Sequence, residues 1–208
     1  MKLMIASDIH GSYLYCSELM KRYEAEKPDR LVLLGDILYH GPRNNLPGEY
    51  NPKNVIELLN PLKKNILCVR GNCDTEVDQM VLDFSILSDY ALISIDDVTI
   101  FATHGHLVDE QFLSRLNDND ILLCGHTHIP ACENDGKHIY LNPGSVSIPK
   151  ACSKNSYMTY ENKTFLWKTL DGETYKEYKI KSSILRDDAV IVPFFIKNIF
   201  ADKPHFPY

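Results

Sequence analysis

Residues 66–74 read ILCVRGNCD, an apolar run of strand length that passes directly into Gly71, Asn72, Cys73 and Asp74. Taken alone, this junction is an ordinary turn, because Gly, Asn and Asp tolerate the backbone conformations that turns need. Its meaning depends on how the other apolar runs of the chain end. They end in the same way, and this repetition predicts both the fold and the chemistry.

Four further apolar runs lead into residues of the types that bind metals. They are LMIA (3–6) before Asp8 and His10, LVLL (31–34) before Asp36, VTIFA (98–102) before His104 and His106, and ILLC (121–124) before His126 and His128. In open α/β sheets, ligands bind at the carboxyl ends of the strands. Glycine stands beside most of these residues and lets the backbone pass close to a site. We therefore expect these side chains to converge.

Each of these motifs has an alternative explanation when it is taken singly. Asp8 and His10 could form a loop pair, and Asp36 could cap a helix or occupy a turn. A buried histidine is more often hydrogen-bonded in a core than bound to a metal. The joint pattern favours a metal site, because five of the eight histidines fall at or beside these strand ends.

The candidate ligands combine imidazole, carboxylate and one amide carbonyl, with no thiolate among them. This mixture suits Mn²⁺, Fe²⁺ or Zn²⁺ better than Ca²⁺ or a cysteine-bound zinc. Seven candidates are too many for one ion and suit two ions about 3.5–4 Å apart that share a carboxylate. The seven are Asp8, His10, Asp36, Asn72, His104, His126 and His128.

The order of apolar runs predicts an α/β fold. Up to about residue 125, short strand-like runs alternate with amphipathic stretches, including helical patterns at 76–82 and 109–116, which implies a mostly parallel sheet. A hairpin is expected between 91–95 and 98–102. From Lys137 onward, short β-like runs joined by turns predict further, antiparallel sheet. We expect a two-sheet sandwich with helices outside, formed by residues 1–180, and a C-terminal extension, 181–208, of unknown role.

Composition narrows the class of protein. The chain has 208 residues and a net charge of −6, which argues against a groove for long nucleic acid as the main surface but leaves room for a nucleotide-sized substrate. The six cysteines form no CxxC pair, the N-terminus does not read as a secretory signal, and no apolar run approaches membrane-spanning length. A reducing cytoplasm and no membrane partner are expected.

These motifs, in this order, resemble the calcineurin-like metallophosphoesterase superfamily, whose pattern is D-x-H, G-D, G-N, a histidine and G-H-x-H. The resemblance spans about residues 1–180. Within the superfamily, the chain is most similar to the small bacterial phosphodiesterases of the YfcE type. Three segments support that closer placement: HGPRNNLP (40–47), VRGNCDTEVDQM (69–80) and LNPGSVSIP (141–149).

The resemblance implies a four-layer α/β/β/α sandwich of two mixed sheets and a division of the ligands between two ions. Asp8, His10, Asp36 and His128 would hold one ion, and Asp36, Asn72, His104 and His126 would hold the other. A metal-activated hydroxide would attack phosphorus. Mn²⁺ is the favoured ion, with Fe or Zn as alternatives.

The same resemblance gives catalytic roles to Asn72, His104 and Cys73. Many superfamily members have a histidine after the asparagine, where it assists the leaving group, whereas the YfcE-like group has a cysteine, as this chain does at Cys73. A thiol with an ordinary pKa near 8.5 is a poorer acid than imidazolium. Weaker catalysis on poor leaving groups is therefore expected.

Three other residues keep two interpretations. His106 is either a support for the metal ligands or structural, and His40 and Arg43 either reach the substrate phosphate or lie in a solvated loop. Asn142-Pro143-Gly144-Ser145 is predicted to be a turn that supports the site.

The predicted function is hydrolysis of a small phosphodiester. The alternatives are a phosphomonoesterase of small metabolites, and a non-catalytic scaffold like the retromer subunit that has this fold. A homodimer or tetramer is plausible from the resemblance, and the apolar patch at 189–200 keeps an interaction role open.

Overall fold

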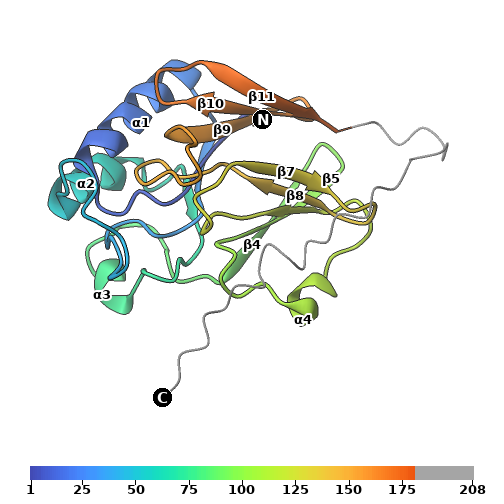
Figure 1. The fold of residues 1–208 in the computed structure, drawn as a ribbon, viewed down its shortest axis with the longest axis horizontal. Helices are drawn as coiled ribbons and strands as arrows, with labels where there is room; N and C mark the ends of the chain where they lie inside the picture. The colour runs from blue at the N-terminus through green and yellow to red at the C-terminus, as the bar shows by residue number, and fades with distance from the viewer. Residues whose placement is uncertain (181–208) are drawn as a thin grey trace.

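The structure, a computed structural model, describes residues 1–180, so the predicted C-terminal extension lies outside the described residues. Two mixed β-sheets pack face to face (Figure 1). The first has the order β11-β10-β9-β1-β2-β3, and its strands are β1 (Leu3–Ala6), β2 (Arg30–Leu33), β3 (Ile66–Cys68), β9 (Ser156–Glu161), β10 (Thr164–Thr169) and β11 (Thr174–Lys179). The second has the order β4-β5-β6-β8-β7, and its strands are β4 (Tyr90–Ile95), β5 (Val98–Thr103), β6 (Ile121–Leu123), β7 (Ala131–Asn134) and β8 (Ile139–Asn142).

Helices lie outside the sheets. They are α1 (Tyr13–Glu26), α2 (Pro52–Leu59), the 3₁₀ turn η1 (Asn60–Leu62), α3 (Glu76–Gln79) and α4 (Glu110–Leu113). Helix α1 begins where the Ser12 hydroxyl accepts the backbone N–H of Tyr15, and α2 begins with Pro52 after the capping residue Asn51. Helices α1 and α2 cover the first sheet, and α4 lies beside the second (Figure 1). Within residues 1–180, no helix is both long and apolar enough to cross a membrane.

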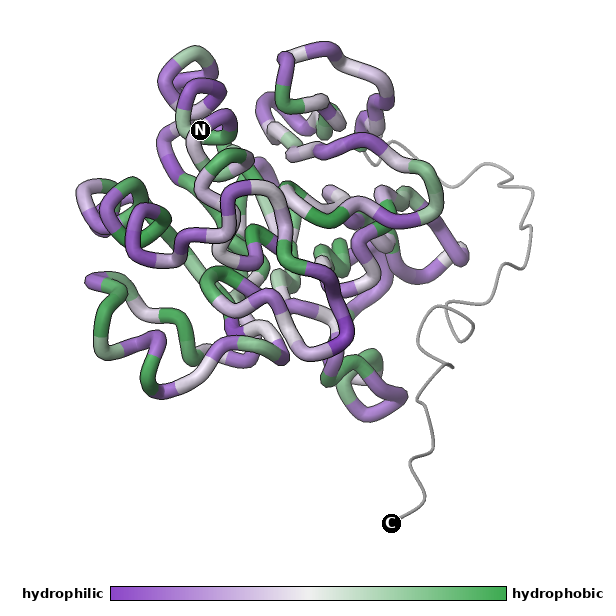
Figure 2. Tube along the Cα trace, turned by 60° about the vertical axis from the view of Figure 1, so that its left-hand side comes forward, coloured by the Kyte–Doolittle hydropathy of each residue, from purple (hydrophilic) through white to green (hydrophobic). Residues whose placement is uncertain are grey.

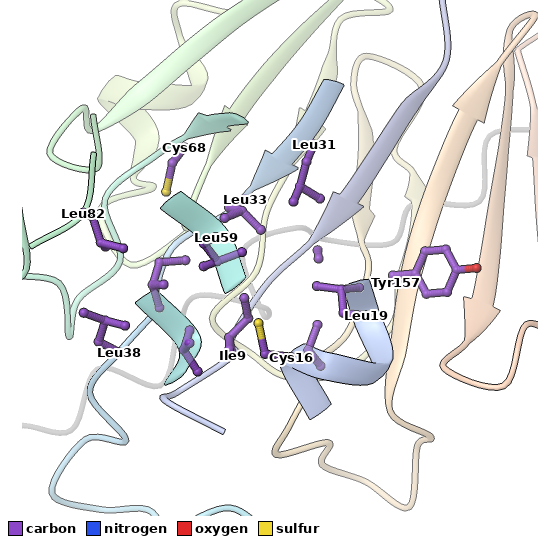
Figure 3. Close-up of a cluster of buried hydrophobic side chains, with 14 of the residues drawn as sticks. Ile9, Cys16, Leu19, Leu31, Leu33, Leu38, Leu59, Cys68, Leu82 and Tyr157 are labelled. Atoms are coloured by element: carbon purple, nitrogen blue, oxygen red, sulfur yellow. The ribbon is translucent and has the colours of Figure 1, made fainter. Parts of the chain in front are cut away.

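The alternation of side chains along the strands creates three apolar layers. In β1, Met4 and Ala6 pack with the helices, whereas Leu3 and Ile5 pack between the two sheets. Figure 3 shows the helix-side layer, where Leu19 of α1 lies close to the sheet. Strands β5 and β6 repeat the alternation toward α4. The helices mix hydrophilic and hydrophobic residues along their length (Figure 2), as expected for elements with one buried side. The predicted α/β/β/α sandwich is confirmed.

The sequence predictions differ from the structure in three places. Strand β8, expected to be antiparallel, pairs parallel with β6 and antiparallel only with β7. Strand β7 was not expected, because its residues, ACEN (131–134), carry little β-propensity and form an edge that depends on its neighbour. The helices predicted at 76–82 and 109–116 are single turns, α3 and α4, which are too short to be stable without tertiary contacts. The hairpin of β4 and β5 is confirmed, with Ile95 opposite Val98.

The carboxyl ends of β2 and β3 are tied together by one buried carboxylate. Asp74 accepts the backbone N–H groups of Asp36 at 2.8 Å, Ile37 at 2.9 Å and Gly71 at 2.7 Å. Its side chain is 2% exposed, so water does not compete for these bonds. In the other direction, the N–H of Cys73 donates to Asp36 Oδ1 at 2.8 Å. The two loops therefore hold each other in one arrangement.

Asp74→Asn is expected to destabilise the metal-free protein by about 2–4 kcal/mol, because an amide cannot accept all three N–H donors and loses the charge that strengthens those bonds. Urea unfolding followed by circular dichroism measures this change. Asp83→Asn is the control, since Asp83 pairs with Lys63 at a half-exposed site, and it should cost less than about 0.5 kcal/mol. Equal stability of the two variants would contradict this role of Asp74.

Candidate metal centre

The seven predicted ligands converge in loops that follow strands from both sheets. Asp8 and His10 follow β1, Asp36 follows β2, and Asn72 follows β3. From the second sheet, His104 directly follows β5, and His126 and His128 follow β6. Strands β1, β2 and β3 run parallel, as do β5, β6 and β8, which brings their carboxyl ends to one edge of the sandwich.

One group of side chains gathers around Asp8. Its Oδ1 lies 3.3 Å from His128 Nε2 and 3.7 Å from His10 Nε2, and the two imidazole nitrogens are 3.3 Å apart. All three residues are at least 97% buried, with exposed fractions of 0% for Asp8, 1% for His10 and 3% for His128. Donor atoms this close can share one ion.

A second group gathers around His104. Its Nε2 lies 3.0 Å from Asn72 Oδ1 and 3.5 Å from Asp36 Oδ2, and its ring centre is 5.0 Å from that of His126. Asp36 Oδ2 is also 3.7 Å from His10 Nε2, so one carboxylate oxygen faces both groups. Asn72 is exposed and His126 half-buried, which opens this group to solvent.

Backbone carbonyls fix the orientation of three of the histidines. His10 Nδ1 donates to the carbonyl oxygen of Tyr39 at 2.8 Å. In the same way, His104 Nδ1 donates to the carbonyl of Leu34 at 2.6 Å, and His128 Nδ1 donates to the carbonyl of Ile148 at 2.6 Å. A carbonyl oxygen only accepts, so in each neutral ring the proton is on Nδ1 and the Nε2 lone pair faces the cluster. This is the tautomer and the second contact that metal-bound histidines usually have.

The cluster lacks positive charge unless a cation or extra protons supply it. Asp8 Oδ1 is buried without a hydrogen-bond partner, and Nε2 of His10 and of His128 face each other as acceptors. Burial opposes ionisation of Asp8, yet the charge of His128 holds its pKa well below the usual value. Burial likewise opposes the charged form of His104, but Asp36 raises the pKa of His104 to about 9. Divalent cations would satisfy these donors and displace such protons, so the residues fit a metal site.

The backbone at the site is unusual. Five of the seven predicted ligands have positive φ, a region that side chains other than glycine seldom occupy and that clusters at functional sites. They are Asp8 (59°), His10 (49°), Asp36 (55°), His126 (66°) and His128 (61°). Gly71 is required because a Cβ atom there would overlap the Asp36 carboxylate. The sequence predicted these residues but gave no sign of this strain.

The loop after β8 supports the site, as predicted for Asn142 and Ser145. The hydroxyl of Ser145 donates to the backbone oxygen of Asp8 at 2.9 Å, and Asn142 donates to the carbonyl of Gly125 at 2.7 Å. Ser147, which the sequence reasoning missed, also donates to the oxygen of Asp8, at 3.0 Å. The two serine contacts join residues more than 130 positions apart, so only the order of the strands could have pointed to Ser147.

Cys73, expected to be catalytic, and His106, which kept two interpretations, both lie at the site. Cys73 Sγ lies within 4.8 Å of donor atoms of His10 and Asp36. Burial and the nearby Asp36 carboxylate raise the pKa of this thiol, so it is protonated and neutral. The ring of His106 lies 5.4 Å from that of His104, and burial lowers the pKa of His106 to about 4. It is therefore a neutral neighbour of the ligands.

His40 and Arg43 lie in the loop that follows Asp36. The ring of His40 packs edge-on against Tyr39 and Tyr50, with ring centres 4.8 and 5.2 Å away. Arg43 is exposed, in agreement with the solvated loop.

Comparison with known proteins places this arrangement in a family. Residues 1–164 match the family model described as the calcineurin-like phosphoesterase superfamily domain. Over 162 residues the chain is 46% identical to Phosphodiesterase YfcE of Escherichia coli K12, covering 78% of this chain and 88% of that protein. The crystal structure of the E. coli phosphoesterase YfcE superposes with a TM-score of 0.83 at 43% identity, covering 87% of this chain and all of that one.

A more distant likeness concerns the fold alone. The structure of Vps29 from Entamoeba histolytica in complex with Zn²⁺ superposes with a TM-score of 0.57 at 20% identity, covering 86% of this chain and 98% of that one. The family match over most of the chain and the identity to the E. coli protein are decisive. The chain belongs to the calcineurin-like phosphoesterase superfamily and is a metallophosphoesterase.

Proposed function

We propose that the protein is a phosphodiesterase that hydrolyses a small phosphodiester at a site for two divalent cations. Asp8, His10 and His128 would hold one ion, and Asn72, His104 and His126 would hold the other. The observation that carries the proposal is the position of Asp36, whose Oδ2 lies 3.7 Å from His10 Nε2 and 3.5 Å from His104 Nε2. A carboxylate between two sets of donors is the arrangement of bridged two-metal sites.

When bound, the ions would supply Lewis acidity, which polarises phosphoryl oxygens and lowers the pKa of a coordinated water. The chain itself holds the ligand side chains in position and provides a buried electrostatic environment. The N–H of Cys73 and the carboxylate of Asp74 fix Asp36, and backbone carbonyls fix three imidazoles, so the donors need no rearrangement during the reaction. Burial removes water from the group around Asp8 and strengthens the electrostatic interactions within it. Because Asn72 is exposed, the group around His104 is open to substrate.

The diester preference rests on the resemblance to the YfcE-type phosphodiesterases. The E. coli relative bears the name phosphodiesterase, at 46% identity. In this chain, the neutral thiol of Cys73 stands beside the donors, and a thiol whose pKa is raised by burial is a weak acid toward a departing alkoxide. Cys73 therefore bears on the leaving group, and the choice between diester and monoester is left to the resemblance.

The donor atoms and the cysteines support proposals for the identity of the metal and for the cell compartment. The mixed nitrogen and oxygen donors suit Mn²⁺, with Fe or Zn as alternatives. The six cysteines, all within residues 1–180, are free, which fits a reducing cytoplasm. A homodimer or tetramer stays a prediction, which size-exclusion chromatography of the full chain decides. The scaffold alternative has support from fold likeness only.

Metal-stripped protein should hydrolyse bis-p-nitrophenyl phosphate only after Mn²⁺ is restored, because the ions would supply the Lewis acidity that the reaction needs. Asp36→Asn should lower kcat/KM by at least about 100-fold, since it removes the shared ligand. Asp97→Asn, in the exposed turn between β4 and β5, is the matched control and should leave the rate unchanged. Release of p-nitrophenolate measures the hydrolysis rate of the wild-type protein and of the two variants.

Comparison with p-nitrophenyl phosphate separates the alternatives. Faster cleavage of the monoester would replace the proposal with a phosphomonoesterase. Binding of Mn²⁺ without turnover of either ester would favour the scaffold.

Cys73→His should raise kcat/KM for diphenyl phosphate by about tenfold or more and change that for bis-p-nitrophenyl phosphate far less. The physical reason is that phenolate is the poorer leaving group and gains more from an imidazolium donor. Cys132→His places the same ring in the edge strand β7 and serves as the control. If the Cys73 variant improves neither substrate, Cys73 does not set leaving-group preference.

A further inference from the structure

A pocket of about 350 Å³ adjoins the metal centre on the side of Cys73. Cys73 belongs to both, because its Sγ lies within 4.8 Å of donor atoms of His10 and Asp36 and the residue also lines the pocket. The pocket wall is tied to the site a second time, since the backbone oxygen of Tyr39, a wall residue, accepts from His10 Nδ1 at 2.8 Å. An ester group of a phosphoryl ligand beside Cys73 would extend into this space.

The wall of the pocket is aromatic and aliphatic. Tyr39 and Tyr50 supply its aromatic part, and Val77 and Val81 belong to its aliphatic part. Val77 is 70% exposed and Val81 45% exposed, and together with the tyrosines they leave apolar surface for a ligand to cover. A volume near the lower end of the range for small-ligand sites suits one ring system.

The charge of the pocket is negative. Among its described lining residues, none is a lysine or an arginine, and Asp78 contributes a carboxylate. One oxygen of that carboxylate is held by Thr75, through its N–H and its hydroxyl, each at 2.8 Å, in the cap of α3. A second anionic group of a ligand would find no partner here and would be repelled.

The wall is also rigid. The capping box of Thr75 and Asp78 closes the start of α3. Gln79 donates to the carbonyls of Leu82 at 3.1 Å and Phe84 at 2.9 Å, which fixes the segment that carries Val77 and Val81. A preformed wall lets a ligand bind without ordering a loop.

We propose that this pocket receives the ester group beside Cys73 and selects an uncharged aromatic group over an anionic one. The inference rests on the proposed function and specifies its substrate class as phosphodiesters with one aromatic or heteroaromatic ester group. Diesters whose corresponding group carries a further phosphate or carboxylate are disfavoured.

Calorimetry of the Mn²⁺-loaded full chain with methylphosphonate, phenylphosphonate and 4-carboxyphenylphosphonate tests this inference without turnover. Phenylphosphonate should bind about tenfold more tightly than methylphosphonate, because its ring is buried. The added carboxylate should abolish that gain. Val77→Glu should reduce the phenyl preference, and Val77→Lys should restore binding of the carboxylate compound.

Leu92→Glu, at an exposed position of β4 outside the pocket, is the matched control and should leave all three affinities unchanged. Equal binding of methyl- and phenylphosphonate, binding of neither, or indifference to both Val77 variants would overturn the inference. If the protein hydrolyses bis-p-nitrophenyl phosphate but binds methylphosphonate and phenylphosphonate equally, the proposed function holds and the role of the pocket is rejected. Selective phenylphosphonate binding without hydrolysis of any diester would keep the pocket and reject the proposed function.

Discussion

The burial of two carboxylates, Asp8 and Asp36, at the junction of the two sheets is the constraint on which the rest of the site depends. Both are at least 98% buried, and buried negative charge is costly unless positive charge or hydrogen bonds compensate it. The surrounding imidazoles present lone pairs, which compensate carboxylates only through a cation or added protons. The composition of this edge is therefore explained by metal binding and is poorly explained by stability alone.

The fold makes this arrangement possible by supplying rigid strand ends from two sheets. Parallel strands β1 to β3 and β5, β6 and β8 bring loops distant in sequence to one edge. The loops then hold one another through buried polar contacts, of which the Asp74 carboxylate and the hydroxyls of Ser145 and Ser147 are the clearest. Strained backbone at the ligands is tolerated because these contacts restrain it.

Much of this could be predicted from sequence because the pattern is local. Each strand and its ligand lie within about eight residues, so the runs before Asp8, Asp36 and His104 point to the site without knowledge of the fold. What could not be predicted depends on distant contacts. Strand β7 forms only against β8, and the pocket joins Tyr39 and Tyr50 to Val77 across separate loops. Periodicity in the sequence does not predict these long-range contacts.

The central claim is that one buried edge holds two ions on either side of Asp36. The most direct measurement is anomalous diffraction from crystals of the Mn²⁺-loaded protein, collected at the manganese absorption edge. The account predicts two peaks per chain, one beside Asp8, His10 and His128 and one beside Asn72, His104 and His126, with Asp36 in contact with both. A single peak, or two peaks of which one does not contact Asp36, would contradict it.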